Sequence, residues 1–360
     1  GADAICFFQW RQSKSGAEAF HSAMLPHAGA DSKVFRGVCE LGKALKTLSD
    51  AGLQGTELER AGTAILFSAE SEWATRSETL PSMKLNHWHD VRDWYRGFLD
   101  AGLRADVVPL AYDWTGYKTI VLPTVLSLSG EDVRRIADFA KAGGTVIVGY
   151  ATGLIDEYFH IGLGGYPGAG NGLLRDMLGI RSEEFNILGE EAEGEPSEIS
   201  LSNGLTTRLW QNDVTSVAAD ATVLASYTGE SAADWELERT PAITSRPYGN
   251  GAAIYVGCDL NRHDIAQLLK ALGSRWRELS AQPTEGGQTP TYPTTDPRIL
   301  HTIRRSPDGS TRFDFYLNRS NQPVVINGVE GKPIIAHRCE TDAVGYTLNR
   351  NAILIAKTSC

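Results

Sequence analysis

Residues 119–148 read TIVLPTVLSLSGEDVRRIADFAKAGGTVIV, and this stretch decides the fold class of the chain. It opens and closes with short, continuous runs of β-branched and aliphatic residues, which are typical of strands buried on both faces. Between the runs, Ser129 and Asp132 have the spacing of a helix-capping pair, and the glycines at 143–144 would end a helix that covers 131–142. A strand, a helix and a second strand in this order predict a parallel α/β sheet covered by helices on both faces.

The same alternation continues on both sides of this stretch. Apolar runs and helical spacing predict further strands at 64–67, 105–108 and 252–256 and further helices at 86–101 and 265–272. The sequence that precedes the last of these strands is irregular, and its glutamate-rich segment, 181–198, is expected to be a solvated loop. We therefore predict one α/β domain over residues 62–280.

The beginning of the chain has a different pattern. Residues 4–8 predict a buried strand, residues 17–24 permit a helix, and residues 32–51 predict an amphipathic helix. Together they make residues 1–61 a single βα unit, which cannot bury its own sheet face. We expect this unit to complete a sheet formed elsewhere, and we expect the chain to be the C-terminal part of a longer protein.

The end of the chain is predicted to be a linker followed by strands. Residues 282–295 are rich in Thr, Pro and Gly, which is typical of a linker. Beyond it, a turn at Pro307–Gly309 separates the first two of the predicted strands, which are 300–304, 312–318, 324–326 and 352–357. Residues 281–360 are therefore predicted to hold the linker and a small antiparallel β domain.

The charge balance and the cysteines restrict the possible partners and location. The 360 residues carry 34 Lys and Arg against 44 Asp and Glu, a formal net charge of −10. An acidic chain repels phosphate backbones, so we expect no nucleic-acid partner. No apolar run reaches the roughly 18–20 residues that cross a bilayer, so we expect no membrane association. Five widely spaced cysteines form no C-x-x-C motif and no disulfide framework, which indicates a reducing compartment, the cytoplasm.

Three motifs suggest chemistry that their spacing does not support. The glycine-rich run 162–172 contains no G-x-G-x-x-G and follows no strand directly, so we interpret it as a mobile loop rather than a dinucleotide site. His87 and His89 are alternate residues of a predicted helix and point about 200° apart, so a shared metal ion is not expected. Cys258 with His263 lacks the tight elbow of a thiol nucleophile, and Cys258 is expected to be a small buried residue. We predict no cofactor and no metal site.

The first thirty residues carry the strongest functional signal. Phe7, Phe8 and Trp10 lie at the end of the predicted strand, and Glu18 and His21 follow with a spacing of three residues. That spacing places a carboxylate and an imidazole on one face of a helical turn. Sugar sites combine an aromatic face for the C–H side of the ring with charged groups for the hydroxyls. The alternative is a strand end with a local Glu–His pair and no ligand.

These opening residues resemble a known family. The stretches GADAICFFQWRQ (1–12) and GAEAFHSAM (16–24) are similar to the last strand, and the loop after it, of the (β/α)₈ catalytic barrel of glycoside hydrolase family 42 β-galactosidases. Residues 64–273 resemble the family's trimerisation domain, an amidotransferase-like fold without the amidotransferase chemistry. The tail resembles the family's small C-terminal β domain. The resemblance therefore implies a remnant of the barrel followed by these two domains.

The resemblance also implies a reaction and a substrate site. The family hydrolyses terminal β-D-galactose residues with retention, and it uses one glutamate as acid/base and another as nucleophile. Both are expected upstream of Gly1, so we expect no catalytic residue in this chain and no activity from the chain alone. Glu18 and His21 match the family residues that bind galactose hydroxyls, and Phe8 matches an aromatic residue of the same pocket. The expected substrate is a β-galactoside.

The expected assembly is a homotrimer formed through residues 62–280. Trp73 and Trp114 follow predicted strands and are candidates for its contact surface. The alternative to the enzyme is a non-catalytic oligomerisation or carbohydrate-binding module derived from one. An upstream reading frame with seven more βα units and two glutamates at strand ends would favour the enzyme.

Overall fold

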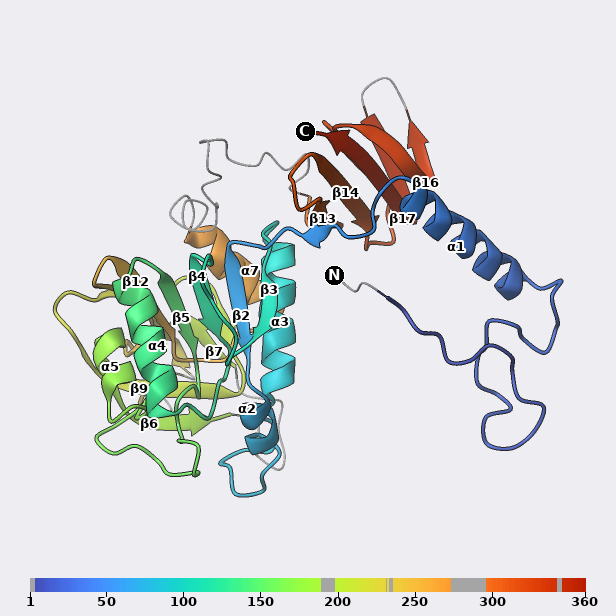
Figure 1. Ribbon diagram of the computed structural model, residues 1–360. Coiled ribbons are helices and arrows are strands. Elements are labelled where there is room, and N and C mark those ends of the chain that lie inside the picture. The colour runs from blue at the N-terminus through green and yellow to red at the C-terminus, as the bar shows by residue number, and fades with distance from the viewer. Residues whose placement is uncertain (1–3, 189–197, 231, 233–235, 273–295, 342–344) are drawn as a thin grey trace. The chain divides into compact units, whose positions relative to one another are not determined.

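The computed structural model describes residues 4–188, 198–230, 232, 236–272, 296–341 and 345–360. The chain divides into two compact units (Figure 1). The central unit covers Arg60–Thr291, and the terminal unit combines Gly1–Glu59 with Tyr292–Cys360. Each unit has its own sheet and its own buried core.

The central unit is built on a nine-stranded sheet with the order β3-β2-β4-β5-β12-β11-β10-β7-β8. The first five strands are parallel, and they are β2 (Thr63–Phe67), β3 (Asp106–Pro109), β4 (Thr119–Leu122), β5 (Thr145–Gly149) and β12 (Gly251–Val256). The other four add antiparallel pairs, and they are β7 (Ile199–Leu201), β8 (Thr206–Thr207), β10 (Thr222–Thr228) and β11 (Pro241–Tyr248). The predicted parallel sheet is confirmed, and it continues into an antiparallel half that was not predicted.

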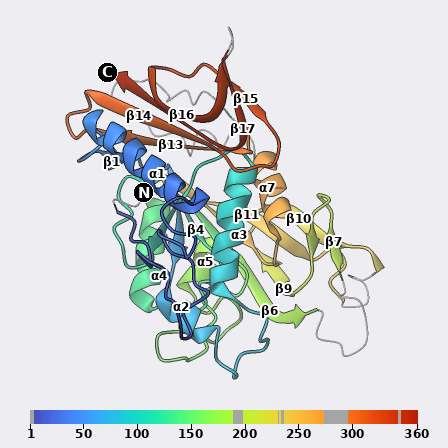
Figure 2. The ribbon, with the colours of Figure 1, turned by 90° about the vertical axis from the view of Figure 1, so that its right-hand side faces the viewer.

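Helices cover both faces of this sheet, as predicted (Figures 1 and 2). One face packs against α4 (Gly130–Lys141) and α5 (Leu173–Leu178), and the other packs against α3 (His87–Asp100) and α7 (Arg262–Ala271). The short helix α2 (Ala69–Ala74) follows β2. The expected capping pair starts α4, because Ser129 Oγ accepts a hydrogen bond from the Asp132 N–H and the Asp132 carboxylate accepts one from the Ser129 N–H.

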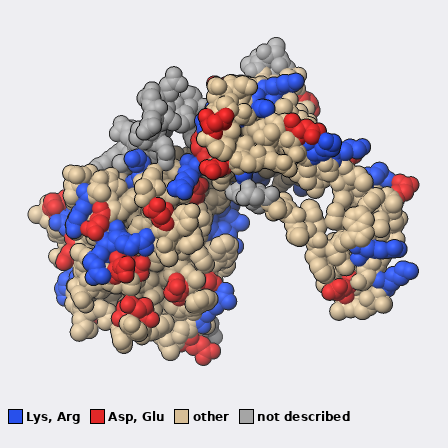
Figure 3. Space-filling model, in the orientation of Figure 1, with Lys and Arg blue, Asp and Glu red and all other residues tan. Residues whose placement is uncertain are grey.

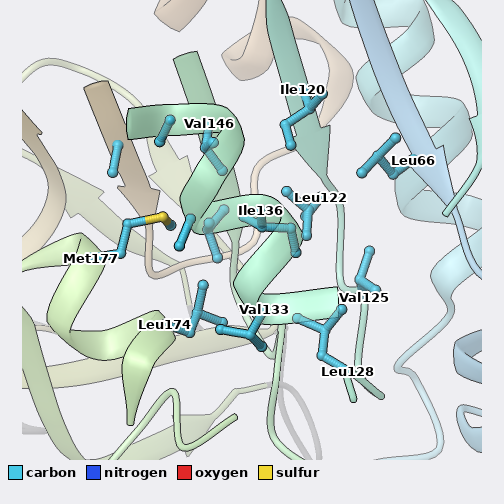
Figure 4. Close-up of a cluster of buried hydrophobic side chains, with 14 of the residues drawn as sticks. Leu66, Ile120, Leu122, Val125, Leu128, Val133, Ile136, Val146, Leu174 and Met177 are labelled. Carbon is cyan, nitrogen blue, oxygen red and sulfur yellow. The ribbon is translucent and has the colours of Figure 1, made fainter. Parts of the chain in front are cut away.

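Alternate residues of each parallel strand divide between two cores. Ile120 and Leu122 of β4 belong to the same buried cluster as Val133 and Ile136 of α4 (Figure 4). Val121, between them in sequence, belongs to the opposite cluster with α3 and α7. Because both side-chain directions are buried, the strand consists entirely of apolar and Thr residues.

Helices α3 and α7 cross very closely at Gly97, which has no side chain. A Cβ at this position would lie 2.5 Å from Ile265 Cγ2 and 3.2 Å from the Arg262 carbonyl oxygen. We expect Gly97→Ala to lower the free energy of unfolding of the central unit by about 1–3 kcal/mol, because the helices must separate. Urea unfolding followed by tryptophan fluorescence measures this loss. Gly130→Ala in α4 is the control, since its Cβ would meet only the end of the Arg134 side chain, 3.9 Å away.

In the described residues, the terminal unit contains a six-stranded antiparallel sheet and one helix, α1 (Lys33–Asp50). Its strands are β1 (Glu57–Leu58), β13 (Ile299–Arg305), β14 (Thr311–Asn318), β15 (Val324–Asn327), β16 (Lys332–Thr341) and β17 (Gly345–Ser359). The four predicted strands are confirmed, and β1 and β16 are additions. The predicted linker, 282–295, lies outside the described residues.

The C-terminal end of α1 packs on this sheet, whereas much of its apolar face stays uncovered. Leu48 is buried against Phe313 and Ile355. Val34 and Leu45, which share the predicted apolar face, are 52% and 57% exposed. The amphipathic helix predicted at 32–51 is therefore confirmed, but only its last turns contact the described part of the sheet.

The prediction of a buried strand at 4–8 is wrong. Residues 4–8 form no strand and their side chains are exposed, with Ile5 at 75%. A strand needs a neighbour to share its hydrogen bonds, and no described strand pairs with this segment. The helix permitted at 17–24 is also absent, because the chain there forms turns and then pairs with residues 9–12.

The middle of the chain is more ordered than its composition indicated. The segment 181–198 was expected to be a loop, but β6 (Ile180–Ile187) pairs with β9 (Trp210–Val217) as an antiparallel ribbon. Residues 189–197 lie outside the described residues. The glycine-rich run 162–172 is a loop, and Tyr166 ties it to β6 through two backbone hydrogen bonds with Ser182.

Candidate functional site

The residues that carried the functional prediction form a closed loop in the terminal unit. The Met24 N–H donates to the Gln9 carbonyl at 2.9 Å, and the Leu25 N–H donates to the Trp10 carbonyl at 2.8 Å. The Gln12 N–H in turn donates to the Leu25 carbonyl at 3.1 Å. These bonds hold the two ends of the loop side by side, so the residues between them form a closed loop.

Glu18 and His21 lie together at the tip of this loop. The His21 N–H donates to the Glu18 carbonyl at 3.0 Å, which places both residues in one turn. Both side chains are exposed. Phe8 precedes the paired segment at the base of the loop and is 71% exposed. The structure thus brings Glu18 and His21 into one turn, as their spacing indicated, although the turn is not helical.

Gln12 is a positioning residue that the sequence analysis missed. Its side-chain Nε2 donates to the Ala19 carbonyl at 3.3 Å, and its Oε1 accepts from the His27 N–H at 2.9 Å. The side chain therefore crosses the loop and connects its tip to its exit. In the sequence, only its position close after the aromatic residues 7–10 could have indicated this role.

The side chains of this loop are of the kinds that can recognise a molecule with hydroxyl groups. A carboxylate accepts hydrogen bonds from hydroxyl groups, a neutral imidazole can both donate and accept, and an exposed aromatic ring covers C–H groups. Retaining glycoside hydrolysis needs two carboxyl groups about 5–5.5 Å apart across one sugar. Glu18 has His21, not a second carboxylate, as its neighbour in the turn.

His87 has a structural role. The Ser68 N–H donates to its Nε2 at 2.9 Å, so this nitrogen accepts and Nδ1 carries the proton, which it donates to the Pro123 carbonyl at 2.8 Å. Burial lowers the pKa of His87, which keeps the ring neutral. His89 is exposed. Among the described residues, no group of three or more His, Cys, Asp and Glu side chains is arranged to hold a metal ion.

Cys258 is buried, as predicted, and burial raises the pKa of its thiol well above the usual value. A thiol in this state is a poor nucleophile. His263 is exposed near the start of α7. The structure therefore supports the interpretation of Cys258 as a small core residue.

A polar cluster lies where β4 and β5 end. Asp90 Oδ2 accepts hydrogen bonds from Thr124 Oγ1 at 2.5 Å and from the Tyr150 hydroxyl at 2.8 Å. Burial raises the pKa of Asp90 to about 7, because desolvation outweighs these two bonds, and the carboxylates of Asp259 and Asp93 add to the effect. Thr124 is fully buried and its hydroxyl is used by Asp90, so we interpret the cluster as structural.

This cluster predicts a pH dependence of stability. The folded pKa of Asp90 lies above its usual value of 3.8, so the folded state binds the extra proton and is favoured at low pH. This contribution is lost as the pH rises from about 4 to 7. We expect Asp90→Asn to raise the unfolding temperature relative to the wild type by more at pH 8 than at pH 5. Each kcal/mol gained in the free energy of unfolding should raise the unfolding temperature by about 2–4 °C.

Thermal unfolding of both proteins at the two pH values measures the difference. Asp138→Asn makes the same change at an exposed position of α4 and should keep the pH dependence of the wild type. An equal effect of Asp90→Asn at both pH values would contradict the assignment.

Comparison with known proteins places the whole chain in one family. The sequence model of the β-galactosidase trimerisation domain matches residues 61–280. The chain belongs to glycoside hydrolase family 42. Two further models of this family match, the β-galactosidase model at residues 1–48 and the β-galactosidase C-terminal domain at residues 299–358. The resemblance inferred from the opening residues is therefore confirmed.

Relatives in family 42 support the same conclusion. The β-galactosidase BbgII of Bifidobacterium bifidum is 42% identical over 359 residues, which cover 99% of this chain and 49% of that protein. A β-galactosidase of an Arthrobacter species is 36% identical over 320 residues, 89% of this chain and 42% of that protein. The chain thus spans about half the length of these relatives or less.

The fold is shared with solved family 42 enzymes. A catalytic mutant of Gan42B, a GH42 β-galactosidase from G. stearothermophilus, matches with a TM-score of 0.83 at 25% identity, over all of this chain and 49% of that one. None of the described helices is both long enough and apolar enough to cross a membrane.

The two tryptophans predicted at a contact surface have different environments. Trp73 on α2 is 68% exposed, as the prediction requires. Trp114 is only 5% exposed, so the prediction for it is wrong. The Arg135 guanidinium lies 4.2 Å from the centre of the Trp114 ring and Phe139 packs edge-on against it, so α4 covers the indole.

Proposed function

We propose that this chain is the C-terminal portion of a β-galactosidase that hydrolyses terminal non-reducing β-D-galactose residues with retention. One observation carries the proposal: the β-galactosidase model matches residues 1–48, the same segment whose loop displays Glu18 and His21 in one turn. In such an enzyme one glutamate attacks the anomeric carbon while another protonates the leaving oxygen and then activates water. Both belong to the half of the relatives' length that this chain does not span.

The loop of the terminal unit supplies part of the galactose site. Glu18 accepts hydrogen bonds from ring hydroxyls, His21 bonds a neighbouring hydroxyl, and Phe8 covers the apolar face of the sugar. The exposure of all three side chains supports this role, because a substrate can reach them. The substrate is a β-galactoside, and no cofactor is required by this chemistry.

The test compares this chain with the complete enzyme. Sequencing upstream of Gly1 should show seven more βα units with two glutamates at strand ends, and the full-length protein should release nitrophenol from a nitrophenyl β-galactoside. NMR of the first product should show β-galactose, which establishes retention. The 360-residue chain alone should show no turnover. Turnover by this chain would mean that the catalytic pair is misplaced, and an inactive full-length protein would favour the non-catalytic module.

The proposed assembly is a homotrimer formed by the central unit. The match of the trimerisation-domain model to residues 61–280 supports self-association. The proposed domains are the last barrel βα unit at 1–61, the trimerisation domain at 62–280 and the linker with the small β domain at 281–360. The proposed location is the cytoplasm, which the five free thiols support.

A further inference from the structure

Exposed apolar side chains gather at the end of the central unit where the parallel strands finish. A first group, the corner, belongs to α2, the segment after it and the first turn of α3 (Figure 1). It consists of Trp73, Met83 and Trp88, which are 68%, 64% and 50% exposed. The corner is rigid, because the Glu72 carboxylate on α2 accepts a hydrogen bond from the Trp88 N–H at 3.0 Å and pairs with Arg76 at 2.7 Å.

A second group, the hairpin, follows β5. It consists of Tyr158, Ile161 and Leu163, which are 72%, 58% and 89% exposed. An antiparallel bridge between Ile155 and Ile161 closes the hairpin. The Asp156 carboxylate accepts backbone hydrogen bonds from Tyr158 at 2.9 Å and from His160 at 2.8 Å. The apolar side chains are thus displayed on an ordered segment, which lowers the entropy cost of binding.

The two groups are neighbours on one surface. The Ser127 N–H donates to Ser71 Oγ on α2 at 3.1 Å, and Ser127 Oγ donates to the Asp156 carbonyl in the hairpin at 3.1 Å. Ser127 therefore connects the helix of the corner to the base of the hairpin. The corner and the hairpin are thus two exposed apolar patches that lie side by side, and such patches mark interaction sites.

We propose that the hairpin of one copy of this chain packs against the corner of the next copy around a three-fold axis. This inference rests on the homotrimer proposed above, and it specifies which surfaces of neighbouring copies are in contact. A closed ring of three needs two different surfaces on each copy, and the hairpin and the corner are two such surfaces within residues 61–280. Trp, Tyr and Met are enriched at interface cores. On the face shown in Figure 3, acidic and basic side chains of the central unit are intermingled, so no field of a single sign opposes contact between copies.

The test is the mass of the 360-residue chain by light scattering at tens of micromolar. The wild type and Val223→Glu, a matched change at an exposed apolar residue of β10, should have three times the 39.1 kDa of one copy. Trp73→Glu in the corner and Leu163→Glu in the hairpin should each have the mass of one copy. Circular dichroism verifies folding, and Tyr158→Glu serves as a second hairpin variant if Leu163→Glu fails to fold.

The outcomes separate this proposal from the trimer itself. A folded Trp73→Glu or Leu163→Glu protein that stays trimeric overturns the contact but not the trimer, whereas a monomeric wild type overturns both. A mixture of the two variants provides a second result, because the intact hairpin of Trp73→Glu can pack against the intact corner of Leu163→Glu. The mixture should contain a two-copy complex that neither variant forms alone, and its absence at about 200 micromolar contradicts the pairing of hairpin with corner.

Discussion

In the complete enzyme, Glu18→Gln and His21→Ala should each lower kcat/KM for a nitrophenyl β-galactoside by about 30- to 1000-fold, or roughly 2–4 kcal/mol. The reason is that, in the proposed galactose site, both groups bind hydroxyls remote from the scissile bond, and such binding energy orients the sugar for reaction. Glu18→Gln keeps the size of the side chain and removes its charge. Steady-state kinetics at several substrate concentrations measure the loss.

The control for this prediction lies on the same loop. Lys14 is exposed between the paired segment and the tip, and Lys14→Ala should keep kcat/KM within about twofold of the wild type. Folding and assembly of all three variants should be unchanged, because neither Glu18 nor His21 is buried. Either variant with kcat/KM close to that of the wild type would remove its residue from the proposed galactose site.

The largest stability effect is expected at Asp314 in the terminal unit. This residue is 1% exposed, and its Oδ1 accepts hydrogen bonds from His301 Nε2 at 2.7 Å and from the Arg312 guanidinium at 2.6 Å. Asp314→Ala should lower the free energy of unfolding of this unit by about 3–5 kcal/mol, because it leaves the largely buried Arg312 guanidinium with only the exposed Glu330 carboxylate, 3.7 Å away, as counter-charge. Hydrogen exchange of β13 and β14 measures the loss.

Lowering the pH should also reduce the stability of the terminal unit, by part of the amount lost in Asp314→Ala. Burial alone would raise the pKa of Asp314, but the hydrogen bonds from His301 and Arg312 outweigh it and lower the pKa below its usual value. The stability from this carboxylate is therefore present above about pH 4 and lost as the pH falls through the lowered folded pKa. Asp308→Ala is the matched control, since Asp308 lies exposed in a turn, and it should cost about 1 kcal/mol or less. An Asp314→Ala protein as stable as Asp308→Ala would contradict the role of the buried pair.

The elements predicted most accurately are those whose side chains are apolar on both faces. Val146, Ile147 and Val148 are fully buried, so their sequence contains no alternation and indicates a central parallel strand. The antiparallel half was missed for the opposite reason. In β9, Gln211 and Asn212 are buried and form hydrogen bonds with neighbouring polar side chains, and no apolar pattern indicates a strand there.

The candidate site shows where local sequence is insufficient. Residues 4–8 have the composition of a core strand, but a strand requires hydrogen-bonding neighbours that no described residue provides. Trp114 lies between Asp113 and Thr115 and therefore resembled an exposed loop residue, whereas Arg135, far away in sequence, covers its ring. The spacing of Glu18 and His21 needed only one turn, and that part was predicted correctly.

The two ends of the nine-stranded sheet have a consequence for how copies of this chain can meet. β8 is only two residues long, and β3 ends at Pro109, whose nitrogen has no proton to donate. β3 is itself only four residues long, so this edge also presents a short stretch of backbone. A foreign strand finds few free backbone groups at either edge, which disfavours sheet-to-sheet polymerisation into fibres. Copies of this chain are therefore expected to associate through side-chain surfaces, and the resulting assemblies should be limited in size and reversible.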